Sequence, residues 1–143
     1  MLRHIDCLIL NESEARELMK ETSLIKAGRA LLKRGPKYVC IKKGEHGCLL
    51  FGQDLFFSAG AYPLEDIHDP TGAGDCFAGA FTGYLASVGH VDHNALRKAV
   101  IYGSVIASYN VEAFSLGRLL RLTRQDIEQR YHVFKHMSHF ETA

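Results

Sequence analysis

The chain has 143 residues, which is enough for one domain with a sizeable core and too few for two ordinary ones. Hydrophobic residues make up 47% and charged residues 23%, a composition that is typical of a globular protein and excludes a disordered chain. Lys and Arg number 17 against 16 Asp and Glu, so the basic excess typical of nucleic-acid binding is absent. No apolar run approaches the roughly 18 residues that a membrane helix needs.

The cysteines and the first residues of the chain both favour a cytoplasmic protein. The opening MLRHIDCLIL is too short and too charged for a cleavable signal peptide. The chain has neither C-x-x-C spacing nor the high density of cysteines typical of a disulfide scaffold. We therefore expect reduced thiols that pack as small hydrophobic side chains. The four cysteines concerned are Cys7, Cys40, Cys48 and Cys76.

The first part of the chain alternates strand and helix patterns. Asn11 is a good N-cap with Glu14 three positions later, and Gly35-Pro36 is a typical helix stop. A Gly-bracketed turn at 43–47 and a second turn at 52–54 separate short apolar runs. The expected elements are a strand over 5–10, helices over 12–20 and 24–33, strands over 37–42 and 48–51, and a strand followed by a further edge strand within 55–67.

From Gly72 onward the apolar residues recur at helical spacing. The first of these helices ends at Gly89, Asp92 is a plausible cap for the next, and Thr123 with Asp126 predicts the start of a last helix that runs toward His136. Alternating strands and helices followed by helices indicate an α/β layer architecture.

The segment 69–75, DPTGAGD, carries the strongest chemical signal because it joins a β-rich stretch to a long helix. Small residues let backbone N–H groups approach a ligand, and a helix start favours negative charge, so Gly72, Ala73 and Gly74 predict an anion pocket. A carboxylate at the same place, Asp75, could abstract a proton there. The alternative is an Asp that only stabilises the first helical turn, and the letters GAGD taken alone favour that alternative.

The whole segment resembles the D-T-x-G-A-G-D signature of the ribokinase-like (PfkB) carbohydrate kinase family, with Pro70 in place of the usual Thr. Three further features stand in the family's order: N-x-x-E at 11–14, a strand with a G-x-x-G loop at 39–47, and a small-residue helix at 103–110. The seven-residue signature is highly specific and N-x-x-E alone is weak. The resemblance covers nearly the whole chain, and the order of the four features is what identifies it.

The resemblance implies a ribokinase-like layered α/β/α fold, with residues 1–143 as the C-terminal, nucleotide-binding part. Family members are much longer, and their N-terminal half carries the sugar-binding residues and a small β-sheet lid. We expect that half to be absent, and the chain to act as a homo-oligomer or with a partner half. Two alternatives to a sugar or nucleoside kinase stay open: a nucleotide-binding module without catalysis, and a half-protein that needs a separate N-terminal half.

The implied activity is ATP-dependent phosphoryl transfer to an alcohol group of a sugar or nucleoside. By resemblance, Asp75 would be the catalytic base, and Gly72, Ala73 and Gly74 would neutralise charge on the transferred group. Asn11 and Glu14 would hold Mg²⁺ and phosphate through waters, although an ordinary helix cap explains the same two residues equally well. The other residues implied at the nucleotide are Lys42, Lys43, Gly44, Gly47, Gly103 and Asn110, and those implied at a K⁺ ion are Asp69 and Thr71.

Three histidines share one face of the last expected helix. Their spacing could hold zinc, but no other ligand lies nearby in sequence, so we expect surface side chains instead. The three are His132, His136 and His139.

Overall fold

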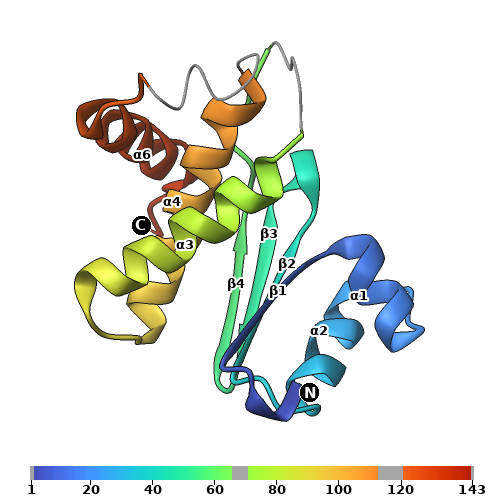
Figure 1. The fold of residues 1–143 in the computed structure, drawn as a ribbon. Helices are drawn as coiled ribbons and strands as arrows, with labels where there is room; N and C mark the ends of the chain where they lie inside the picture. The colour runs from blue at the N-terminus through green and yellow to red at the C-terminus, as the bar shows by residue number, and fades with distance from the viewer. Residues whose placement is uncertain (1, 66–70, 113–120, 143) are drawn as a thin grey trace. The chain divides into compact units, whose positions relative to one another are not determined.

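The computed structural model describes residues 2–65, 71–112 and 121–142, and Figure 1 shows its helices and strands. The chain groups into two compact units, Met1–Ala61 and Tyr62–Ala143. The first combines a sheet with two helices, and the second is helical. Each unit is described by itself below.

The first unit is built on a mixed four-stranded sheet in the order β1-β2-β3-β4 (Figure 1). Strands β1 and β2 are parallel, whereas β2, β3 and β4 follow one another as antiparallel hairpins. The short turns between the last three strands allow this antiparallel pairing, while the two helices between β1 and β2 provide the crossover that parallel strands need. The strands span Cys7–Asn11, Tyr38–Lys42, Cys48–Gly52 and Leu55–Ala59.

Helices α1 (Glu12–Met19) and α2 (Leu24–Leu32) cover one face of this sheet (Figure 1). The close approach of α2 depends on Gly28, because a Cβ there would lie 2.4 Å from the Phe51 ring. Alternate residues of the strands face the helices, as the two-residue period requires. The buried residues of this core are Leu10, Ala15, Ala27, Leu31, Val39, Ile41, Leu49 and Phe51.

The second unit is built from α3 (Ala73–Val88), α4 (His93–Glu112) and α6 (Arg124–Ser138). Gly103 lets α3 and α4 pack closely, because a Cβ there would lie 2.8 Å from the Phe77 ring and 3.1 Å from its carbonyl oxygen. Where α4 meets α6, Val105, Tyr109 and Phe134 form a small buried core.

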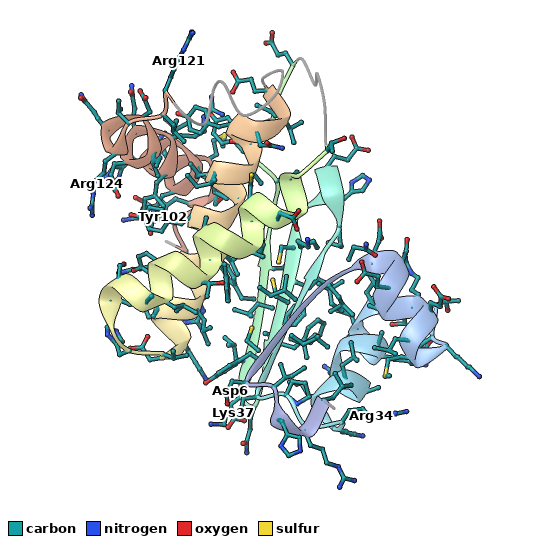
Figure 2. All side chains as sticks on the ribbon, viewed as in Figure 1. Asp6, Arg34, Lys37, Tyr102, Arg121 and Arg124 are labelled. Atoms are coloured by element: carbon teal, nitrogen blue, oxygen red, sulfur yellow. The ribbon has the colours of Figure 1, made fainter. Side chains whose placement is uncertain are left out.

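Stacked aromatic rings connect α3, α4 and α6. Tyr84, Tyr102 and Tyr131 lie in a row, with ring centroids 4.8 and 4.3 Å apart. The hydroxyl of Tyr102, labelled in Figure 2, donates to the Glu128 carboxylate at 2.9 Å. Burial, followed by this hydrogen bond, raises the pKa of Tyr102 above its ordinary value. The phenol therefore stays a hydrogen-bond donor at neutral pH.

Arg130 of α6 lies between two further rings of the second unit. Its guanidinium is 3.7 Å from the Tyr109 ring centroid and 4.5 Å from that of Tyr62, and it pairs with Glu112 at 2.8 Å. Only 14% of the Arg130 side chain is exposed, so these contacts are partly desolvated and correspondingly stronger. They fix α6 against the end of α4.

The caps expected from the sequence are present, and one expected strand is not. Gly89 ends α3 in the left-handed conformation, Asp92 accepts from the Ala95 amide, and Thr123 with Asp126 forms a complete capping box. The further edge strand expected after β4 is wrong for residues 60–65, which have no strand structure, and the rest of it lies outside the described residues. None of the described helices is long and apolar enough to cross a membrane.

All four cysteines are free thiols, as expected from their spacing. Cys40 and Cys48 are buried with their sulfur atoms 3.0 Å apart. The contact with Cys48, followed by burial, raises the pKa of Cys40 well above its ordinary value, and burial raises that of Cys7 to about 11. The thiols of Cys7 and Cys40 therefore stay protonated at neutral pH, which makes them poor nucleophiles. Among the described residues no three His, Cys, Asp or Glu side chains are grouped so that they could share a metal ion, and this holds for His132, His136 and His139.

The close packing at Gly103 leads to a stability prediction. Gly103→Ala should lower the free energy of unfolding by about 1–3 kcal/mol, because the new methyl group overpacks the contact with Phe77. Gly83→Ala in α3 is the matched control. A Cβ there meets nothing within 4 Å, so alanine should raise the free energy of unfolding by about 0.5–1 kcal/mol. Urea unfolding measures the change in the free energy of unfolding of each variant. Equal changes in the two variants would show that α3 and α4 do not pack as described.

Candidate active site

The loop before α3 presents backbone N–H groups at the start of a 16-residue helix. Gly72 is the N-cap and has φ +83°, a left-handed conformation that glycine adopts without strain. The first helical hydrogen bond runs from the Cys76 amide to the Gly72 carbonyl at 2.9 Å. The amides of Ala73, Gly74 and Asp75 precede this bond, and the first amides of a helix have no acceptor within the helix. Such amides at a helix start suit an anion, and the anion pocket itself stays a prediction.

Asp75 stands at the third position of α3 with an exposed side chain. It therefore places a solvent-accessible carboxylate within one turn of the first amides of the helix. The neighbouring Cys76 thiol is partly buried, and burial, with the Asp75 charge as second cause, raises its pKa. The Cys76 thiol therefore stays neutral beside Asp75.

Of the two residues predicted at a cation site, Asp69 and Thr71, the structure describes only Thr71. Thr71 is exposed and its carbonyl oxygen accepts a hydrogen bond of 2.9 Å from Asn110 Nδ2. Asp69 and Pro70 lie outside the described residues, so the cation site predicted at Asp69 and Thr71 stays a prediction.

The first unit holds a second group of predicted residues, at the carboxyl ends of its two parallel strands. Asn11 ends β1 and Lys42 ends β2, and the two are paired in the sheet register. Asn11 Oδ1 accepts from the Glu14 amide at 2.8 Å, and Asn11 Nδ2 donates to Glu14 Oε1 at 2.5 Å. Asn11 and Glu14 therefore form the helix cap. Asn11 and Lys42 also lie at the carboxyl ends of parallel strands, where α/β folds bind ligands.

The turn after β2 contains the predicted nucleotide loop. Its ends are joined by a 2.7 Å hydrogen bond from the Lys43 amide to the Gly47 carbonyl. Gly44 and Gly47 have φ +56° and +93°, so both occupy the left-handed region. A Cβ at Gly47 would lie 2.0 Å from the Ala59 carbonyl oxygen, so only glycine fits there. Gly47 thus has a structural function, and its predicted contact with a nucleotide stays a prediction.

The structure brings the predicted residues together in two groups, one in each unit. Asn11, Glu14 and Lys42 to Gly47 share one end of the sheet, while Gly72 to Asp75 and Asn110 meet at the start of α3. Gly103 is buried against Phe77, about two turns from Asn110 along α4, so its observed contacts are helix packing. The contact between Asn110 and Thr71 was not predicted, because no local pattern links residues 39 positions apart.

Comparison with known families decides the affiliation. The family described as "pfkB family carbohydrate kinase" matches residues 1–121. The chain belongs to the pfkB family of carbohydrate kinases. This confirms the family resemblance of the four motifs and the ribokinase-like α/β fold.

Individual relatives of this pfkB-family chain include sugar and nucleoside kinases. A bifunctional ribokinase/ribose-5-phosphate isomerase A of Fructilactobacillus sanfranciscensis is 32% identical, over 78% of this chain and 21% of that protein. A cytidine kinase of Thermococcus kodakarensis is 37% identical, over 57% of this chain and 30% of that protein. A putative ribokinase II from E. coli, solved in complex with ATP and Mg²⁺, is 28% identical with a TM-score of 0.74, covering 92% of this chain and 41% of that one.

The chain therefore spans less than half the length of these relatives.

Proposed function

We propose that this chain is the ATP-binding, phosphoryl-transferring part of a kinase that phosphorylates an alcohol group of a sugar or nucleoside. The observation that carries this proposal is the start of α3, where the amides after Gly72 precede the first helical hydrogen bond and an exposed Asp75 stands beside them. A transferred phosphoryl group needs donors that neutralise its charge, and its acceptor hydroxyl needs a base. Backbone amides and a carboxylate that could serve these two functions lie within one turn of α3.

Asp75 acts in this proposal as the general base. Its carboxylate accepts the proton of the substrate hydroxyl while the hydroxyl oxygen bonds to the γ-phosphorus of ATP and the bond to the β,γ-bridging oxygen breaks. The products are a phosphate ester, ADP and a protonated Asp75, which then returns its proton to solvent. The amides of the Gly72–Gly74 loop stabilise the charge on the phosphoryl oxygens during this transfer.

The nucleotide and its Mg²⁺ are assigned to the other group of residues. Asn11 and Glu14 supply an amide and a carboxylate oxygen, both exposed at the carboxyl end of β1, a donor set that fits Mg²⁺ held through water. Held by Asn11 and Glu14, Mg²⁺ would withdraw negative charge from the phosphate groups. Lys42, Lys43, Gly44 and Gly47 would line the nucleotide, and Thr71 with Asp69 would hold K⁺. The ATP and Mg²⁺ named for the E. coli relative support the cofactors.

A second candidate function is a nucleotide-binding module without catalysis, acting alone or with a separate partner half. The exposed Asp75 beside the anion-binding loop favours the kinase, because a module that only binds nucleotide has no use for a base.

Titration of the ¹⁵N-labelled chain with MgADP tests the assigned nucleotide residues. We expect weak, saturable binding that shifts the amide signals of 43–47 and 72–74, because phosphate oxygens polarise the N–H groups that they contact. Glu14→Gln should weaken MgADP binding more than metal-free ADP binding, whereas Glu17→Gln, on the same helix, should change neither. Shifts confined to other segments, or no binding at millimolar MgADP, would contradict the assignment.

A further inference from the structure

We propose that Asn110 is a positioning residue that fixes the orientation of the peptide group between Thr71 and Gly72, and with it the anion-binding loop. The functional consequence rests on the kinase function proposed above, whereas the structural role does not. Asn110 lies in the last turn of α4, and its Nδ2 donates a 2.9 Å hydrogen bond to the Thr71 carbonyl oxygen. This hydrogen bond joins the last turn of α4 to the loop before α3.

The orientation of that peptide group matters because its two polar atoms point in opposite directions. In a trans peptide the carbonyl of Thr71 and the N–H of Gly72 lie on opposite sides of the chain, and no cis peptide is present among the described residues. Holding the carbonyl toward Asn110 therefore directs the Gly72 N–H away from α4. A flipped peptide would reverse the two and present a carbonyl oxygen where the loop now presents a donor.

Glycine makes such a flip sterically possible. A flip changes the sign of φ at the following residue, and Gly72, at φ +83°, tolerates either sign, unlike residues with a Cβ. The backbone alone therefore does not hold this peptide in one orientation, so a side-chain hydrogen bond can decide between the two. Such a bond shifts an equilibrium by a factor of roughly 2 to 10.

The surroundings of Asn110 favour this positioning role over the contact with the nucleotide that the family resemblance implies. Only 7% of its surface is exposed, which leaves little area for a ligand. A Cβ on Gly72 would lie 3.8 and 3.9 Å from the two polar atoms of the Asn110 amide, so the amide group lies against the loop. The helix that carries Asn110 is in turn fixed against α3 through Gly103 and Phe77. Asn110 thus joins the loop to a rigid helix pair.

The first test is structural and uses the 143-residue chain. Asn110→Ala removes the donor, and Asn110→Asp keeps the shape while replacing the donor by a carboxylate oxygen. Both should move the ¹⁵N and ¹H signals of Gly72 and Ala73 and speed hydrogen exchange at these amides several-fold. Val100→Ala, a buried position of the same helix, controls for lost stability and should leave these signals in place. Unchanged Gly72 and Ala73 signals in both folded Asn110 variants would overturn the proposal.

The second test is kinetic, in an enzyme completed by the N-terminal half of a ribokinase. Asn110→Ala should lower kcat by roughly 2- to 10-fold with the KM for ATP and sugar unchanged, and Asn110→Asp should lower it further, because its charge opposes the phosphoryl group. A raised KM for ATP at constant kcat would indicate contact with adenine and overturn the proposal. Shifted Gly72 signals in the isolated chain together with an inactive but folded parent enzyme would uphold the positioning role and reject the proposed kinase function.

Discussion

In an enzyme completed by an N-terminal half, Asp75→Asn should lower kcat by about a hundred- to ten-thousand-fold, the range that general-base catalysis contributes. The substitution preserves the shape of the side chain and its place in the first turn of α3, and removes only the ability to accept a proton. The affinity for nucleotide should therefore stay within a few-fold of the parent. A coupled assay of ADP release and a binding titration measure the two quantities.

Asp92→Asn is the matched control for this substitution. Asp92 is also an acidic residue at the start of a helix, where it accepts a hydrogen bond from the Ala95 amide at 2.7 Å. Asparagine caps helices about as well as aspartate, so this variant should keep both its activity and its stability. If Asp75→Asn weakened nucleotide binding as severely as turnover, Asp75 would be a structural cap and not a base.

The 143-residue polypeptide alone should bind ADP or ATP weakly and phosphorylate no sugar or nucleoside at an appreciable rate. Phosphoryl transfer requires both reactants to be positioned in a closed site, and this chain spans less than half the length of its relatives. A coupled ADP-release assay with ribose, fructose, 2-keto-3-deoxygluconate, adenosine and cytidine tests this. Turnover on any of them at about 1–100 per second, a normal kinase rate, would contradict the expectation.

Local sequence patterns predicted most helices and strands of this chain because local chemistry determines them. The Thr123 and Asp126 capping box and the Gly89 stop depend on residues within one turn, and the structure contains both. The further edge strand after β4 fails over 60–65 because its apolar letters resemble a strand, while pairing in a sheet depends on distant partners.

The candidate site was predictable to the extent that it is local. The motif at 72–75 was expected to form a loop entering a helix, and the structure places it there. The hydrogen bond from Asn110 to Thr71 was not predictable, because it depends on how α3 and α4 pack. Gly103 illustrates the same limit: its position in a family motif suggested the nucleotide, whereas its contacts show that it packs against the Phe77 ring.

A crystal structure of the completed enzyme with MgADP, a bound sugar and aluminium fluoride tests the central claim most directly, since the fluoride mimics the phosphoryl group in transfer. The account predicts fluorine atoms about 2.7–3.1 Å from amide nitrogens of the 72–74 loop, with an Asp75 carboxylate oxygen facing the sugar hydroxyl that attacks. Aluminium fluoride bound away from the start of α3, or a sugar hydroxyl facing another base, would contradict it.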